Sequence, residues 1–405
     1  MGARVRTITA DEMSPWLDQM GVSFFRRTPE GSAEFYLRNV DLERTRGGFD
    51  GDRVVGTLRS FATEFTVPGP TTIAASALTN VTVAPTHRRR GLLTEMIVPD
   101  LRDSAERGEA VSILIAAEFP IYGRFGYGPA VESAKYTISS AGLRFNRPSV
   151  GRVELVSDRE FRALAPPIYE RFRLAQPGSI ERRDYLWDAM THIAPFPGAE
   201  PPKGSRAIYY SPRGDAEGFV SYKGEMANDM RQNGTLTVDD LTAVSSDAYQ
   251  ALWEFCCGID LTTTVVASER PVDETLSLLV DDARKVQMSA RHDFVWVRVL
   301  NTPVALGGRR YSSAERIVIE VIDALGLAAG TFALDAGRDG ASCTAVNESP
   351  DITVPVSSLG AAYLGATSFS RLHSAGAIYE HRAGAVERAD RMFFVSRAPW
   401  CTTWF

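Results

Sequence analysis

Two stretches of alternating polar and apolar residues dominate the N-terminal part of the chain. The first, RVVGTLRSFATEFTV at 53–67, and the second, TTIAASALTNVTV at 71–83, are rich in β-branched and aromatic residues. Pro-Gly-Pro at 68–70 separates them and is typical of a turn. The pattern therefore predicts a β-hairpin.

A helical pattern and then a buried strand follow this hairpin. Beyond Gly91, the apolar residues Leu93, Ile97 and Leu101 recur at the spacing of one helix face. AVSILIAA at 110–117 is a continuous apolar run, which is typical of a strand buried on both faces. The predicted order is strand, basic loop, helix, strand.

A second and weaker cycle of the same order begins after the linker-like stretch RFNRPSVGR at 144–152. Strand-like segments at 218–224 and 235–244 precede SSDAYQALWEFCCG, whose Ser and Asp favour the start of a helix. This connection lacks the arginines and the glycine of the first cycle. We therefore do not expect it to bind the same phosphates.

The pattern of apolar and turn-forming residues changes again near residue 291. RIVIEVID, TFALD and DITVPV resemble short strands separated by Gly- and Asp-containing turns, and VSSLGAAYLGA resembles a short helix. We expect three domains, at 1–149, 150–290 and 291–405.

The composition is that of a folded protein without a general attraction for nucleic acid. The 405 residues are 44% hydrophobic and 23% charged, which is enough apolar material for several cores. Lys and Arg total 44 against 50 Asp and Glu, and the net charge of -6 disfavours nucleic-acid binding. The chain shows no apolar targeting segment and no run of about 18 apolar residues. We expect a soluble, cytoplasmic protein that neither binds nucleic acid nor spans a membrane.

The cysteines and histidines offer no metal site by their spacing. Cys256 and Cys257 are adjacent, and the other two cysteines, Cys343 and Cys401, are isolated, so we expect reduced and mostly buried thiols. Metal and catalytic-triad spacing is also missing among the five histidines, which are His87, His192, His292, His373 and His381. We predict no metal and no histidine base.

The basic loop HRRRGLLTEM could hold an anion. It offers the guanidinium groups of Arg88, Arg89 and Arg90, a glycine that permits close backbone approach, and the unpaired N–H groups of a helix start. This combination suits a pyrophosphate. An arginine cluster before a helix is equally typical of a solvated face.

The segment ALTNVTVAPTHRRRGLLTEMI resembles the acetyl-CoA motif of the GNAT acyltransferase superfamily: Arg or Gln, two residues, Gly, one residue, then Gly or Ala. Leu93 stands at the last position and is a departure. Over its whole length the chain is similar to the Eis family of N-acetyltransferases. Besides the motif and its departure at Leu93, the segments that carry this resemblance are IYGRFGYGPA, LWDAM, ALWEFCCGID and YLGATSFSRL. The resemblance implies an α+β / α/β fold of two GNAT-type mixed-sheet domains, the second without cofactor, then a sterol-carrier-protein-like α+β domain, assembled as a homohexamer.

The resemblance also implies which residues contact acetyl-CoA. Val81, Thr82 and Val83 would present main-chain groups to the pantetheine arm while the valines pack in the sheet. Ala117 and Glu118 would flank the arm from the next strand. Main-chain N–H groups of 89–94 would cradle the pyrophosphate, and the residues implied there are Arg88, Arg89, Arg90, Gly91, Leu92, Leu93 and Thr94.

Acetyl transfer to an amine needs a base for the amine and a proton for the leaving thiolate. The resemblance implies that Tyr122 donates the proton to the thiolate. A phenol with an ordinary pKa of about 10 is protonated at neutral pH and can act as this donor. Tyr127 is a nearby competitor at a position that usually packs. The implied base is the terminal carboxylate of Phe405, whose ordinary pKa of about 3.5 would have to rise by burial among aromatic groups.

The resemblance places Phe24, Arg26 and Trp404 around the acceptor substrate. Aminoglycoside-modifying members carry acidic side chains at two of these places, where this chain has Arg26 and Trp404. We expect altered recognition of polycationic antibiotics and a more apolar or differently charged small-molecule amine. Two alternatives remain open: transfer from a longer acyl-CoA, because the motif contacts the CoA moiety, and a non-catalytic lipid-binding role suggested by the third domain.

Overall fold

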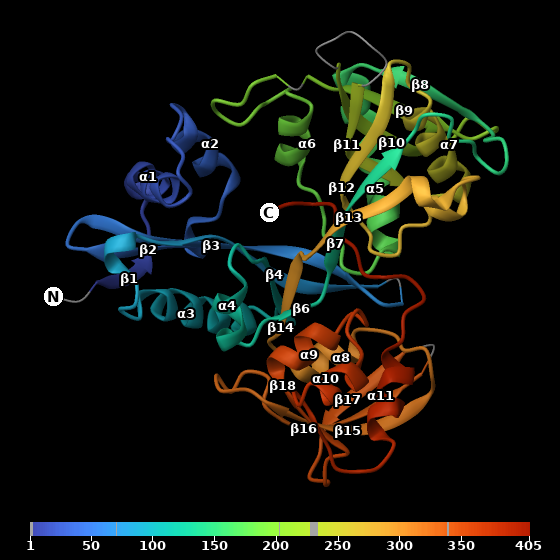
Figure 1. Ribbon diagram of the computed structural model, residues 1–405. Helices are drawn as coiled ribbons and strands as arrows, with labels where there is room; N and C mark the ends of the chain where they lie inside the picture. Colours follow the sequence, from blue (N-terminus) through green and yellow to red (C-terminus); the bar gives the residue numbers. More distant parts are fainter. Residues whose placement is uncertain (1–2, 70, 202, 227–233, 338–339) are drawn as a thin grey trace.

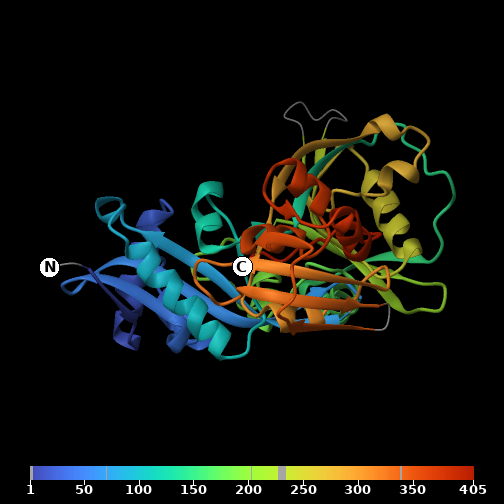
Figure 2. The same cartoon turned by 90° about the horizontal axis from the view of Figure 1, so that it is seen from below.

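The computed structural model describes residues 3–405 except 70, 202, 227–233 and 338–339. Its described strands form two sheets of seven strands and one of five. Figure 1 shows three bodies, with the N-terminus at the far end of the first and the C-terminus between the first and the second. The view from below keeps the first body to one side of the other two (Figure 2). This arrangement confirms the expected fold class.

The first sheet has helices on both faces. Its strands, in spatial order, are β1 (Arg4–Thr7), β2 (Thr45–Asp50), β3 (Arg53–Val67), β4 (Thr71–Val83), β5 (Val111–Ile115), β14 (Val295–Val299) and β6 (Gly128–Pro129). One face packs Val54 against α1 (Met13–Ser23), and the other packs Val55 against α3 (Leu92–Glu106). Adjacent strand residues point to opposite faces, so α1 and α2 (Ser32–Asn39) lie opposite α3 and α4 (Phe119–Tyr122) (Figure 1).

The second sheet repeats this plan. In spatial order its strands are β13 (Val286–Asp293), β7 (Glu132–Ser139), β12 (Thr262–Arg270), β11 (Gly234–Ala243), β10 (Ala216–Glu225), β9 (Ser205–Tyr210) and β8 (Arg152–Val156). Its helices are α5 (Asp158–Ala175), α6 (Asp184–Met190) and α7 (Ser246–Cys257). The expected second cycle of strands and helix corresponds to β10, β11 and α7.

The first two sheets exchange strands. In sequence β7 follows β6 of the first sheet, but it pairs with β12 and β13 in the second. β14 follows β13 but pairs with β5 and β6 in the first. The sheets therefore do not follow the contiguous ranges 1–149, 150–290 and 291–405, because residues 132–139 lie in the second sheet and residues 295–299 lie in the first. Apolar periodicity identifies a strand but not its partner.

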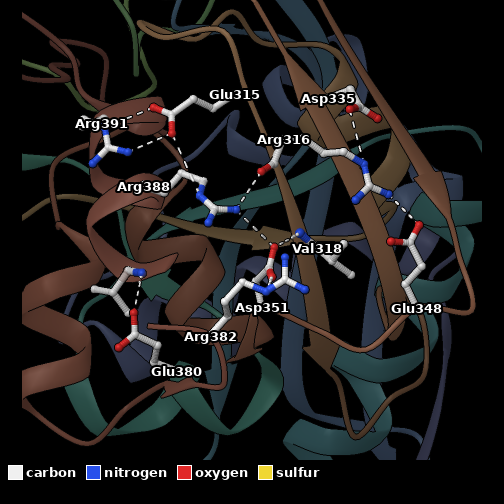
Figure 3. A network of polar contacts seen from close by, with 11 residues as sticks. Glu315, Arg316, Val318, Asp335, Glu348, Asp351, Glu380, Arg382, Arg388 and Arg391 are labelled. Carbon is white, nitrogen blue, oxygen red and sulfur yellow. Dashed lines mark hydrogen bonds and ion pairs between the residues drawn. The ribbon is translucent and has the colours of Figure 1, made fainter. Parts of the chain in front are cut away.

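The third body is a five-stranded sheet with short helices. The strands are β17 (Ala341–Ala345), β16 (Gly330–Ala336), β15 (Glu315–Ile322), β18 (Ile352–Pro355) and β19 (Tyr379–Glu380), and the helices are α8 (Thr302–Gly307), α9 (Val356–Ala362), α10 (Phe369–Ser374) and α11 (Ala385–Phe393). A polar network fixes α11 to β15 (Figure 3). At its centre, the buried Asp351 accepts from the Val318 N–H at 3.0 Å and pairs with Arg382 and Arg388.

The predicted hairpin is confirmed, and its second strand contains a bulge. β3 and β4 pair antiparallel, and their register shifts between Thr57 and Arg59, so that two residues of β4 oppose one of β3. Asn80 lies in this bulge with a φ of 53°. A bulge bends its strand. β4 pairs with β5 only as far as Leu78 and Leu114, so the two strands separate beyond that pair and form a fork.

Candidate active site

The fork between β4 and β5 opens into a cavity of about 450 Å³. The end of β4, the loop before α3, the start of α3, the end of β5 and α4 line it. Thirteen residues implied by the resemblance lie in this lining: Phe24, Val81, Thr82, Val83, Arg88, Arg89, Gly91, Leu92, Leu93, Thr94, Ala117, Glu118 and Tyr122. The structure therefore brings together segments that are far apart in sequence.

The loop before α3 is shaped to receive an anion. Gly91 is the N-cap residue of α3 with a φ of 85°, and Arg89 has a φ of 63°, so both lie in the left-handed region. The first intrahelical bond runs from the Glu95 N–H to the Gly91 carbonyl at 3.1 Å, and no side chain caps this helix. The preceding N–H groups are therefore free to bind phosphate oxygens. No described carboxylate forms an ion pair with Arg88 or Arg89, so the positive charge of both is available.

The corresponding helix of the second sheet is closed. The N-cap residue of α7 is Ser245, whose Oγ accepts from the Ala248 N–H at 3.2 Å and donates to Glu217 at 2.7 Å. A side chain thus occupies one of the donors that a phosphate would need. The first loop has no such side-chain cap, and its geometry fits the pyrophosphate of acetyl-CoA.

The structure distinguishes the two candidate tyrosines. Tyr127 is fully buried, and its hydroxyl lies 2.6 Å from the Ser112 Oγ. Tyr122 lines the cavity, and its hydroxyl forms no hydrogen bond with any described residue. Burial, helped by the charge of Glu118, raises the pKa of Tyr122 to about 12. Its phenol is therefore protonated at neutral pH and free to donate a proton.

The C-terminal segment is anchored rather than frayed. The Trp400 N–H donates to the Pro177 carbonyl at 2.8 Å, and the Ser179 Oγ donates to the Trp400 carbonyl at 2.9 Å. The Thr403 Oγ1 lies 2.7 Å from the hydroxyl of Tyr169. These contacts join the tail to α5 and to the segment between α5 and α6, so the second body anchors the residues that precede Phe405.

Phe405 lies on the face of the first sheet opposite Tyr122. Its ring packs edge-on against Phe61 of β3, with 5.9 Å between the ring centroids. Phe61 pairs with Ala77, which lies one residue before the last β4–β5 pair, so Phe405 is close to the start of the fork. Tyr122 instead packs with Leu58 and Leu78 on the α3 face.

Four of the implied site residues lie outside the cavity lining. Arg90 and Phe405 do not line it, Arg26 is exposed on the loop after α1, and Trp404 is 57% exposed and packs against Phe294. Conversely, the lining contains four residues that sequence reasoning did not assign to the site, namely Ser23, His87, Ile121 and Arg124.

Little in the sequence indicated that His87 and Arg124 belong to the cavity lining. The Nδ1 of His87 lies 2.8 Å from the Thr86 hydroxyl and its Nε2 lies 3.2 Å from the Asp50 carboxylate, so both ring nitrogens have a hydrogen-bond partner. Arg124 stands two residues after Tyr122 in the same segment, and that proximity was the only available signal.

In the described part of the chain, no group of His, Cys, Asp or Glu could hold a metal ion. No described helix has the length and apolarity needed to cross a membrane.

Three family models match successive parts of the chain. Residues 4–130 and 178–299 each match a model of the acetyltransferase (GNAT) domain, and residues 302–402 match a sterol carrier protein domain. The chain is similar to the solved structure of Eis1 from Mycobacterium abscessus, with 31% sequence identity and a TM-score of 0.87. The match covers 99% of this chain and 100% of that chain. A GCN5-related N-acetyltransferase from Anabaena variabilis, at 18% identity and a TM-score of 0.85, shares the fold.

Curated relatives extend over nearly the same length. An uncharacterized N-acetyltransferase of Streptomyces griseus is 40% identical over 414 residues, which cover 99% of both chains. The N-acetyltransferase Eis of Mycobacterium tuberculosis is 34% identical over 357 residues, 86% of this chain and 85% of that protein. The chain thus belongs to the Eis family of GNAT N-acetyltransferases.

Proposed function

We propose that the protein transfers the acetyl group of acetyl-CoA to a primary amine, with Tyr122 as general acid and the Phe405 carboxylate as general base. The free hydroxyl of Tyr122 in the cavity at the fork carries this proposal. Membership of an acetyltransferase family argues against a purely lipid-binding role. From the family resemblance, we further propose a homohexamer that works in the cytoplasm.

The two proposed groups approach the fork from opposite faces of the sheet. The main chain of β4 and the loop before α3 would orient the thioester between them. On the α1 face, the Phe405 carboxylate would take the proton of the attacking amine. On the α3 face, the Tyr122 hydroxyl would donate its proton to the departing sulfur. The proton of the amine would therefore be removed on one face of the sheet, and the proton for the sulfur would be donated from the other.

Replacing Tyr122 by Phe tests the acid. We expect kcat to fall on the order of 10²-fold or more because the departing thiolate loses its proton donor. In the wild type, the raised pKa keeps the phenol protonated, so kcat should show no alkaline loss from this group below about pH 11. Steady-state kinetics across pH measure both effects.

Tyr127→Phe is the matched control because it removes a hydroxyl that is buried and bonded to Ser112. It should lower the free energy of unfolding by about 1–3 kcal/mol and leave kcat nearly unchanged. A Tyr122→Phe enzyme with wild-type kcat, or a Tyr127→Phe enzyme with the larger kinetic loss, would contradict the assignment.

The acceptor is proposed to be an amine other than a polycationic antibiotic. The tail places the aromatic Trp404 beside the terminal residue, and Arg26 adds a positive charge near Phe24 of the cavity lining. We expect lower kcat/KM for kanamycin-like aminoglycosides than for simple aryl-alkyl amines, measured by release of free CoA. Comparable values for the two classes would remove the basis for this preference.

A further inference from the structure

Arg59 is a buried cation on the acceptor side of the fork. It is 7% exposed and lies on β3 two residues before Phe61. Its Nε donates to the Asn80 Oδ1 at 3.0 Å, and Asn80 is the residue in the bulge of β4. The phenols of Tyr36 and Tyr185 are the other neutral groups near its guanidinium. No described ion pair joins Arg59 to a carboxylate, although buried charges are normally paired.

A second guanidinium flanks the same aromatic ring as Arg59. The Cζ of Arg183 is 4.5 Å from the centroid of the Phe61 ring, and the Cζ of Arg59 is 5.3 Å from the same centroid. Arg183 donates to the Ala62 carbonyl at 2.7 Å, and its ion pair with Glu181 is as long as 4.0 Å. Two like charges around one ring repel each other, and burial adds to that cost for Arg59.

Both cations flank the ring against which the last residue packs. The ring of Phe405 packs edge-on against the same Phe61 ring. The described residues contain no ion pair between the terminal carboxylate and either arginine. Aromatic side chains extend the surface away from the fork, since Tyr185 contacts both Phe35 and Phe196 with centroids 6.2 and 6.3 Å apart. This side of the sheet thus combines the unpaired charge of Arg59 with the weakly paired charge of Arg183 and a group of aromatic side chains.

We propose that Arg59 and Arg183 bind a carboxylate of the acceptor, so that the substrate is a small amine carrying both a carboxylate and an apolar body. A guanidinium matches a planar carboxylate with paired N–H donors. The ligand would supply the counter-charge for Arg59, which no described ion pair provides. The same two cations disfavour a polycation by repulsion. This inference rests on the proposed function for the amine end, but the anion site itself does not require catalysis.

The test compares phenylalanine with 2-phenylethylamine, which differ only by the carboxylate. Isothermal titration in the presence of CoA measures binding without turnover. We expect wild-type protein to bind phenylalanine about 10–100-fold more tightly, as for a hydrogen-bonded charged group. Arg59→Met should reduce this preference to near parity, and Arg59→Lys should retain part of it. Arg53→Met removes an exposed charge at the start of the same strand and should leave the preference intact.

Equal affinity of the wild type for both probes would overturn the anion site. So would an Arg59→Met protein that unfolds more easily but keeps the full preference, because Arg59 would then serve only to hold the bulge of β4. A preference in binding without acetylation of either amine would leave the anion site standing and count against the proposed catalytic function. Circular dichroism of each variant establishes that the measured protein is folded.

Discussion

Adding one glycine after Phe405 is expected to abolish acetyl transfer while leaving CoA binding intact. The extra residue moves the terminal carboxylate by about 3.5 Å. The tail cannot retract to compensate, because Trp400 is bound to the segment after α5 and Thr403 is bound to Tyr169 of α5. Loss of a positioned base costs typically 10²–10⁴-fold. Turnover measured at saturating acetyl-CoA, with CoA affinity measured by titration, checks both parts.

Phe405→Leu is the control for the ring. It removes the edge-on contact with Phe61 but leaves a carboxylate at the same chain position. We expect it to lose much less activity than the extended chain, since a main-chain carboxylate remains near the fork. Wild-type turnover in the extended protein, or an equal loss in both variants, would exclude the terminal carboxylate as the base.

The local elements were predictable from the sequence, but their partners were not. The hairpin of β3 and β4 follows from alternation and from Pro-Gly-Pro, because both strands are adjacent in sequence. The exchange of β7 and β14 depends on contacts between segments more than a hundred residues apart. A short apolar strand can join any sheet edge that buries it. For this reason the predicted domain limits miss the exchange.

The candidate site divides in the same way. The loop from Arg88 to Thr94 could be recognised because the contacts proposed for the cofactor would use consecutive main-chain groups and a glycine at the helix start. Arg59 gave no signal, since one arginine in an alternating strand looks like a solvated position. The anion-binding role proposed for Arg59 depends on its burial near Tyr36 of α2 and Tyr185 of α6. These helices are brought to β3 only by the fold.

Asp323→Ala is expected to lower the free energy of unfolding by about 3–5 kcal/mol, the typical cost of breaking a buried ion pair. Asp323 follows β15 in the third body, and its carboxylate pairs with Arg298 of β14 through two contacts at 2.9 and 3.0 Å. The two side chains are 2% and 0% exposed. Without the carboxylate, a buried guanidinium would lose its counter-charge. Urea unfolding followed by fluorescence measures the change.

The same substitution should reach the active site because Arg298 also supports the segment of Tyr122. Its Nε donates to the Phe125 carbonyl at 3.0 Å, three residues beyond the proposed acid. Asp335→Ala provides the matched control: it breaks an exposed pair with Arg316 in the same body (Figure 3), which is worth about 1 kcal/mol or less. If the two variants lose similar stability, the joint between β14 and the third body does not depend on this pair. A large loss for Asp323→Ala alone, accompanied by a fall in kcat, would show that the third body holds the proposed acid in place through β14.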